Sequence, residues 1–348
     1  MFLSCITTQI KKRGSHMNRV DQAFQHIDRD EFVLREDGRQ VTQSTANFAI
    51  RKGLEMLDVQ EGDHVLEIGT GSGFSGALLS QLVGIRGSVV SVDIEPELTK
   101  RARELCKRNN IHNTLFITGD GRNGYDSQKP YDRIIAWTTP PAFPAAWKEQ
   151  IRENGIIVAP FQVLPMARGT VTVRIRNKNG LLHGEAVSGD GYIMMYSEPV
   201  KDINLSGEKI HASLVGDEDH PVWASSEWME KGVSNQEWTE IFYRSQLETS
   251  PFEESGRDIR AYLLGTNPDG FTYAFHPDYG YWVGYSSPDG FALVCDHEPN
   301  QWMISDQEHA DVLKSWWNDW NDIGCPSYEQ LQPFFVGNKV KVKLKGGV

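Results

Sequence analysis

A short apolar segment that leads directly into three alternating glycines constrains the fold more than any other feature of this chain. His64 to Gly69 has the length and character of a buried strand, and the chain continues as Gly69-Thr70-Gly71-Ser72-Gly73. Apolar residues at helical spacing follow from Phe74 to Val83. Because glycine has no side chain, a glycine-rich turn between a strand and a helix lets the backbone approach a ligand closely.

Further strands and helices alternate along the first two hundred residues. Apolar runs predict strands at 64–69, 88–94, 115–117, 132–137 and 155–160, and helical patterns predict helices at 44–57, 74–83, 96–109 and 144–151. This alternation indicates a parallel sheet with helices on both faces. The predicted fold class is therefore α/β and doubly wound, with ligands at the carboxyl ends of the strands.

The residues around the glycine turn separate two cofactor classes. Asp93 ends the next predicted strand, twenty residues after Gly73, where a carboxylate can hold both ribose hydroxyls. A nicotinamide enzyme would show Gly-x-Gly-x-x-Gly, in which the helix start meets a pyrophosphate. Here Glu67 precedes Gly69 by two residues, and a carboxylate suits the sulfonium and ammonium of S-adenosylmethionine. We therefore favour a methyltransferase over a dehydrogenase or a purely structural turn, although Glu67 could simply cap amides of the loop.

A second acidic turn follows the third predicted strand. Gly119-Asp120-Gly121 lies where the adenine of such a cofactor would be, and the Asp120 carboxylate can accept from an adenine amino group. An ordinary Asp-Gly turn explains the same residues equally well. Asp120 and Gly121 are therefore candidate cofactor residues with a structural alternative.

Together, these segments resemble the protein-L-isoaspartate O-methyltransferase family. The similar stretches are the glycine motif at 65–74, a second motif at 90–98, the segments 119–121 and 130–135, and an opening segment at 18–24. The resemblance implies a Rossmann-like class I methyltransferase that esterifies an isoaspartate carboxylate in a peptide, after which the ester closes to a succinimide (aspartimide). The cofactor residues it implies are Glu67, Gly69, Thr70, Gly71, Ser72, Gly73, Asp93, Ile94, Asp120 and Gly121.

The implied chemistry requires little from catalytic side chains. A carboxylate is already a nucleophile at neutral pH, so the enzyme must align the reactants and exclude water. The family places a Ser-x-Pro-type segment before the first strand to hold the substrate carboxylate. The matching residues are Ser44 and Thr45, without the proline, and they are candidate catalytic residues or a plain cap of the predicted helix. Residues 191–195 either close over this site or form an edge strand.

The last 148 residues differ in composition from the rest of the chain. Residues 201–348 carry 11 Lys and Arg against 24 Asp and Glu, and they hold eight of the ten tryptophans. The shift predicts a boundary near residue 200, between a methyltransferase domain at 18–200 and a smaller α+β accessory domain at 201–348. The string Gly14-Ser15-His16-Met17 indicates a tag-like or disordered leader at 1–17. Within the last part, aromatic segments at 259–264, 271–275, 281–285 and 291–294 predict a small antiparallel sheet. An amphipathic stretch at 235–247 precedes them, and a helix is predicted at 307–322.

Two roles for this extension remain open. It is either a second core or dimer contact, or a docking surface for a basic or extended peptide. Extended relatives of the family methylate ribosomally made peptides, including lasso peptides, lanthipeptides and graspetides. We therefore expect a dedicated peptide substrate with a specific Asp, with general isoaspartyl repair as the alternative.

Composition limits the classes of partner and the cellular compartment that we expect for this protein. A net charge of −12 argues against nucleic acid, and no apolar run approaches the roughly 20 residues of a membrane helix. The four cysteines lie far apart without a Cys-x-x-Cys pair, which argues against a disulfide framework and a cysteine metal site. We expect a cytoplasmic protein that needs no metal ion, and the sequence leaves its oligomeric state open.

Overall fold

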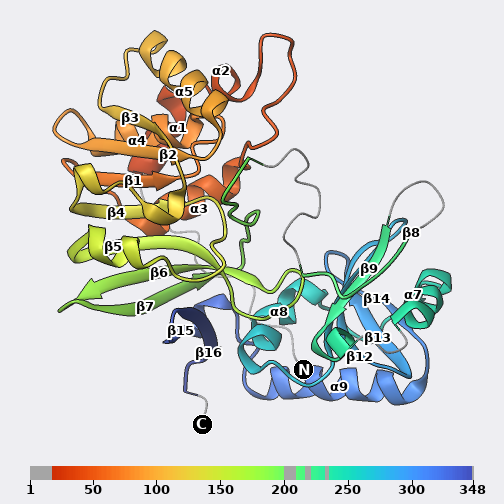
Figure 1. Ribbon diagram of the computed structural model, residues 1–348. Coiled ribbons are helices and arrows are strands. Elements are labelled where there is room, and N and C mark those ends of the chain that lie inside the picture. Colours follow the sequence, from red (N-terminus) through yellow and green to blue (C-terminus); the bar gives the residue numbers. More distant parts are fainter. Residues whose placement is uncertain (1–17, 200–208, 216–220, 232–234, 347–348) are drawn as a thin grey trace, which may run out of the picture.

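Two sheets lie side by side in the structure (Figure 1), a computed structural model that describes residues 18–199, 209–215, 221–231 and 235–346. The first sheet has the strand order β3-β2-β1-β4-β5-β6-β7. Its parallel strands are β1 (His64–Ile68), β2 (Ser88–Asp93), β3 (Thr114–Thr118), β4 (Tyr131–Ala136) and β5 (Ile151–Gln162). β6 (Thr170–Lys178) and β7 (Leu181–Ser188) continue it antiparallel. The five strands predicted from apolar runs are confirmed.

Helices cover both faces of the first sheet. The helices of one face are α1 (Arg19–His26), α2 (Arg29–Val33), α3 (Asn47–Leu57), α4 (Phe74–Val83) and α5 (Pro96–Arg108). α6 (Ala145–Gln150) covers the other face, where Trp147 is fully buried, and the short helices η1 (Gly121–Asn123) and η2 (Asp126–Gln128) precede β4. Alternate strand residues divide between two cores, with Val65 in one and Leu66 in the other. The predicted doubly wound α/β class is confirmed.

The second sheet is antiparallel, as predicted, and larger than expected. Its strand order is β10-β14-β13-β12-β11-β9-β8. The strands are β8 (Ala212–Val215), β9 (Pro221–Ser226), β10 (Glu248–Thr249), β11 (Phe271–His276), β12 (Gly280–Ser287), β13 (Gly290–Cys295) and β14 (Gln301–Ile304). It is accompanied by η3 (Glu227–Lys231), α7 (Asn235–Arg244) and α9 (Gln307–Asp322). Trp238 and Trp282 are buried in its own core, which accounts for part of the tryptophan enrichment.

One predicted strand of this region is wrong. Residues 259–264 lie in helix α8 (Gly256–Thr266). Asp258 Oδ2 accepts 2.8 Å hydrogen bonds from the backbone N–H and the hydroxyl of Ser255, which forms a capping box at the helix start. Ile259 and Leu263, four residues apart, are both buried. This spacing, together with Ser-x-x-Asp, is the signal that identifies a helix.

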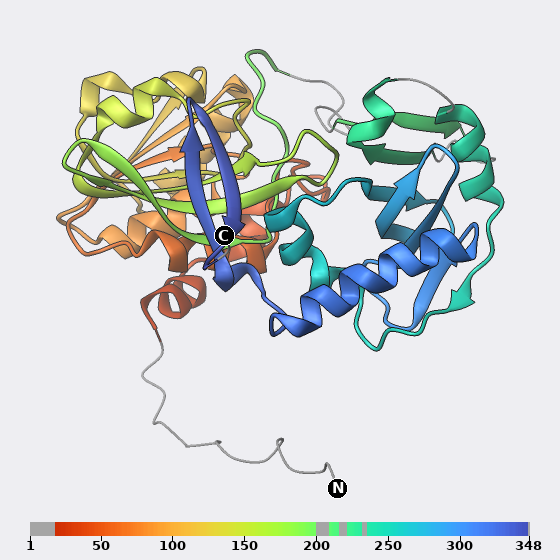
Figure 2. The ribbon, with the colours of Figure 1, turned by 90° about the horizontal axis from the view of Figure 1, so that it is seen from below.

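The C-terminal hairpin returns to the first sheet (Figure 2). β15 (Leu331–Val336) and β16 (Lys339–Leu344) pair antiparallel, and β15 and the short helix η4 (Tyr328–Gln330) contact β7. Gln332 Nε2 donates to the Gly184 carbonyl oxygen at 2.8 Å. The end of the predicted accessory domain therefore packs on the first sheet. The predicted leader at 1–17 and the predicted boundary at 200–201 lie outside the described residues.

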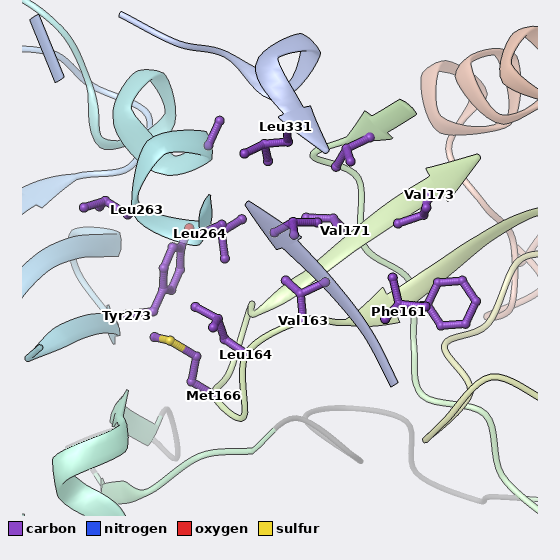
Figure 3. Close-up of a cluster of buried hydrophobic side chains, with 14 of the residues drawn as sticks. Phe161, Val163, Leu164, Met166, Val171, Val173, Leu263, Leu264, Tyr273 and Leu331 are labelled. Carbon is purple, nitrogen blue, oxygen red and sulfur yellow. The ribbon is translucent and has the colours of Figure 1, made fainter. Parts of the chain in front are cut away.

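A continuous hydrophobic core joins the two parts of the chain (Figure 3). Phe161 and Val171 of the first sheet, Leu263 and Leu264 of α8, and Leu331 of β15 are all buried within it. The C-terminal part is thus anchored on the first sheet by apolar packing. No helix in the described ranges is both long enough and apolar enough to cross a membrane.

Candidate active site

A cavity of about 350 Å³ opens at the carboxyl ends of β1, β2 and β4. The glycine turn, the end of β2, the start of α3 and the segment after β7 form its walls. Its volume is within the usual range of small-molecule sites, about 300–1,000 Å³. The predicted site residues that line it are Ser44, Thr45, Gly69, Thr70, Gly71, Ser72, Asp93, Ile94 and Gly121.

The glycine turn has a backbone conformation that suits glycine alone. Gly69, Gly71 and Gly73 have φ values of +93°, +51° and +87°. A Cβ on Gly71 would lie 2.5 Å from the Gln43 carbonyl oxygen, so the turn closely approaches the segment before α3. Gly73 is not part of the cavity wall: it is the N-cap of α4, and its Cβ would lie 2.8 Å from Ala102 Cβ. Gly73 therefore determines how closely α4 and α5 pack.

Asp93 places its carboxylate at the cavity wall. Oδ2 accepts from the Gly71 N–H and Oδ1 from the Glu95 N–H, both at 2.9 Å. Burial raises the pKa of Asp93, while these and neighbouring backbone hydrogen bonds act in the opposite direction. A carboxylate has about four lone-pair positions, so both oxygens can still accept from a ligand hydroxyl. This geometry suits a ribose diol.

Glu67 lies beneath the turn rather than in the cavity. It has no exposed surface, and Oε1 accepts from Ser75 Oγ at 2.5 Å and from Trp137 Nε1 at 2.9 Å. Oε2 accepts from Ser91 Oγ at 2.6 Å. Burial raises the pKa of Glu67 to about 7 in spite of these three donors. Because Ser75 and Trp137 line the cavity, Glu67 would act on a ligand through them.

Asp120 also lies outside the cavity wall, although Gly121 beside it is part of that wall. Its carboxylate accepts from Arg122, with Oδ1 2.9 Å from the backbone nitrogen and Oδ2 2.5 Å from Nη2. Burial favours a higher pKa, but the bonds from Arg122 outweigh it and hold the pKa of Asp120 below its usual range. The carboxylate caps η1, as the structural alternative expects, and a contact with adenine stays a prediction.

The segment before α3 forms part of the cavity wall. α3 begins at Asn47 with Ala46 as its N-cap and no side-chain cap, so the interpretation of Ser44 or Thr45 as a helix cap is wrong. The hydroxyl of Ser44 is buried and has no hydrogen-bond partner in the structure. An unsatisfied buried hydroxyl costs about 1–3 kcal/mol, so this position fits a polar ligand group. Phe48 lines the cavity and is 69% exposed.

The segment after β7 completes the cavity wall. Thr139 holds it through three 2.7 Å hydrogen bonds: its N–H donates to Ile193 O, its Oγ1 donates to Tyr192 O, and its carbonyl oxygen accepts from the Met195 N–H. The Tyr192 ring centre lies 5.8 Å from that of Trp137. Of the two interpretations of residues 191–195, a wall over the site is the one that matches, because the segment forms a single β-bridge and no edge strand.

Trp137 is a site residue that the sequence analysis did not identify. It follows β4 directly and lines the cavity. It also packs against α3 so closely that a Cβ on Gly53 would lie 2.7 Å from its ring. Its position at the carboxyl end of a parallel strand is the signal that could have identified it.

The charges around the cavity favour a cation over a phosphate. Asp93, Glu95 and Glu198 line it, and the described lining residues include no Lys, Arg or His. A dinucleotide pyrophosphate would lack a cationic partner here, whereas a sulfonium or ammonium would be attracted. In the described part of the chain, no three His, Cys, Asp or Glu side chains converge as a metal site would require.

Comparison with known families identifies the family of this chain. The sequence profile of the family described as protein-L-isoaspartate(D-aspartate) O-methyltransferase matches residues 4–198, more than half of the chain. This chain belongs to that family. The solved structure of a protein titled protein-L-isoaspartate O-methyltransferase aligns with 94% of this chain and 95% of its own, with a TM-score of 0.50 and 20% identity. The likeness shows a common fold that includes the C-terminal part.

Curated members of the family are similar over the methyltransferase motifs. Protein-L-isoaspartate O-methyltransferase 2 of Archaeoglobus fulgidus is 42% identical over 106 residues, which are 30% of this chain and 48% of the relative. The enzyme of Methanococcus maripaludis strain C6 is 34% identical over 148 residues, 41% of this chain and 66% of the relative. The chain thus spans about half to two thirds of the length of these relatives.

Proposed function

We propose that this protein is an S-adenosylmethionine-dependent O-methyltransferase that esterifies the side-chain carboxylate of isoaspartate or aspartate in a peptide. The observation that carries the proposal is the cavity itself. It brings the glycine turn and Asp93 together with the unpaired hydroxyl of Ser44 in one site at the ends of the strands. Family membership supplies the reaction class.

The residues present fit the cofactor. Gly69 and Gly71 line the cavity, Asp93 can accept from ribose hydroxyls, and the acidic lining favours a sulfonium. When bound, S-adenosylmethionine supplies an electrophilic methyl group and leaves as S-adenosylhomocysteine. Gly121 begins η1 shortly after β3, and the predicted adenine site is beside it.

The substrate side of the cavity holds a carboxylate with neutral donors. Ser44 and Thr45 offer hydroxyls, and the start of α3 lies beside them in the cavity wall. An ionised carboxylate needs no general base, so these residues only have to orient one oxygen toward the methyl group. The side chains of Phe48, Tyr192 and Ile193 give this region an apolar wall.

Two substrate classes are compatible with this site. General isoaspartyl repair agrees with the names of the relatives, and the structural relative shows that an extended chain occurs in a protein of that name. A dedicated ribosomally made peptide, such as a lasso peptide, agrees with the missing proline after Thr45 and with the acidic C-terminal part. We place general isoaspartyl methylation first, because the extension by itself does not favour a dedicated substrate.

Mass spectrometry of peptides incubated with the protein and S-adenosylmethionine tests the proposal. We expect an isoaspartyl peptide to gain one CH₂ and then lose methanol as it forms the succinimide, and the Asp93→Ala variant should leave it unchanged. A matched Asp peptide and the peptides encoded beside the gene separate the substrate classes. If the wild-type protein leaves every one of these peptides unmodified, the proposed function is wrong.

A further inference from the structure

We propose that the C-terminal part of the chain positions the substrate-side wall of the cavity through Arg260 of α8. This inference rests on the proposed function, which supplies the peptide substrate. Arg260 does not line the cavity, so it is a positioning residue that acts through the backbone of residues 189–196.

Arg260 connects α8 to two loops of the methyltransferase sheet. Its side chain is buried, with 9% of the residue exposed. Nη2 donates to the Arg168 carbonyl oxygen at 2.6 Å, and Nη1 donates to the Gly189 carbonyl oxygen at 3.4 Å. Arg168 lies between β5 and β6, and Gly189 follows directly after β7. One guanidinium from the C-terminal part therefore contacts the turn that leads into the cavity wall.

Tyr328 of η4 packs against the same turn. A Cβ on Gly189 would lie 2.5 Å from carbon atoms of the Tyr328 ring, so only glycine permits this approach. η4 and the following hairpin contact β7, and Leu331 is part of the core shared by both parts of the chain (Figure 3). The surface that contacts Gly189 is therefore held rigidly against the first sheet.

β6 holds the turn from the opposite side. Thr172 Oγ1 donates to the Asp190 carbonyl oxygen at 2.9 Å, and a Cβ on Gly191 would lie 2.5 Å from Thr170 Oγ1. Ser188 Oγ also donates to Asp190 Oδ2 at 2.6 Å. Residues 188–191 thus lie between β6 and the C-terminal part. Gly191 is the first residue of the segment that lines the cavity, so the position of this turn sets the position of the wall.

The surroundings of Arg260 suit a side chain that fixes how the two parts of the chain pack together. Burial opposes its charge, but Tyr328, Tyr273, Asp296 and Asp190 outweigh burial and raise its pKa. Its Nε, the Tyr273 hydroxyl and the Tyr328 hydroxyl are buried without hydrogen-bond partners in the structure. Such a cluster adds little net stability compared with apolar packing. Instead, the cluster favours one arrangement of the two parts of the chain at this turn.

Two readouts test this role: hydrogen–deuterium exchange of residues 189–196, and methylation kinetics with an isoaspartyl peptide. We expect Arg260→Met to speed exchange of the Met195 amide, and to raise the KM for the peptide about fivefold or more, with S-adenosylhomocysteine affinity unchanged within about twofold. Arg260→Lys, which keeps one donor, should restore part of both effects. The matched control is Asn235→Ala, because Asn235 Nδ2 also donates to two carbonyl oxygens, His211 and Met229, within the C-terminal part.

Gly189→Ala perturbs the same turn without changing Arg260. This variant tests the positioning role if Arg260→Met does not fold. It should produce the same faster exchange and higher KM, because the added Cβ displaces the turn from Tyr328. The positioning role is wrong if exchange and KM match the wild type, or if Asn235→Ala changes both equally. If the wild-type protein methylates no peptide, the proposed function fails, and the exchange measurement still decides the role of Arg260.

Discussion

Trp137 Nε1 donates a 2.9 Å hydrogen bond to Oε1 of the fully buried Glu67. Glu67 lies in β1, and Trp137 directly follows β4, the strand that pairs with β1 in the sheet. Trp137 lines the cavity and packs against the ring of Tyr192, which also lines it. The protonation state of a residue beneath the cavity is therefore coupled to an aromatic side chain in its wall.

The pH dependence of folding stability should reveal the raised pKa of Glu67. Burial raises its pKa from 4.5 to about 7 in the folded state. Between these values the folded state binds more protons than the unfolded state, so stability falls as pH rises, by up to about 3 kcal/mol. Below pH 4.5 the carboxyl is protonated in both states and this loss is absent. Glu67→Gln should flatten the slope, which thermal unfolding from pH 4.5 to 8 measures; parallel curves for both proteins would contradict it.

Replacing Asp93 should weaken cofactor binding. Asp93→Asn keeps the shape but places an amide donor against either the Gly71 N–H or the Glu95 N–H, and it removes an acceptor for the ribose. Loss of a hydrogen bond to a charged group predicts a decrease of about tenfold to a hundredfold in S-adenosylhomocysteine affinity, measured by calorimetry. Glu97→Gln, at an exposed surface ion pair with Arg35, is the control that should bind normally. Equal affinities would remove Asp93 from the ribose role.

Local patterns predicted the methyltransferase sheet well. Apolar runs and helical spacing identified β1 to β5, because strands buried on both faces are continuous apolar runs whose ends are marked by glycine and acidic residues. The same patterns identified α9 over 307–322. The aromatic content of 259–264 favoured a strand there, and the capping box at Ser255 overrode it.

Contacts between segments far apart in the chain could not be predicted from the sequence. Helix α3 begins at Asn47 rather than near Ser44, because the preceding backbone packs against the turn at Gly71. The Asp120 carboxylate is held by Arg122, and no spacing rule decides between that pair and a ligand. Arg260 becomes informative only when folding brings α8 against residues separated from it by more than seventy positions.

Glycine 71 should be the most sensitive position of the turn. Gly71→Ala adds a Cβ 2.5 Å from the Gln43 carbonyl oxygen at a φ of +51°, so the backbone strain and the clash combine. Gly38→Ala is the matched control: its φ is +80°, and its added Cβ would have no atom within 4 Å. The strain alone costs about 1–2 kcal/mol. Chemical denaturation should show a larger loss of stability for Gly71→Ala, and calorimetry should show weakened S-adenosylhomocysteine binding in that variant only.

Ser44→Ala should separate substrate binding from stability. The Ser44 hydroxyl is buried without a hydrogen-bond partner, so its removal should leave the unfolding midpoint unchanged or slightly higher. If the hydroxyl donates to the substrate carboxylate, the KM for an isoaspartyl peptide should rise about tenfold or more, while S-adenosylhomocysteine affinity stays constant. Ser245→Ala, which removes an exposed hydroxyl that bonds to Ile241 O of α7, should change neither quantity. A Ser44→Ala enzyme with wild-type KM would show that Thr45 and the amides at the start of α3 hold the carboxylate without Ser44.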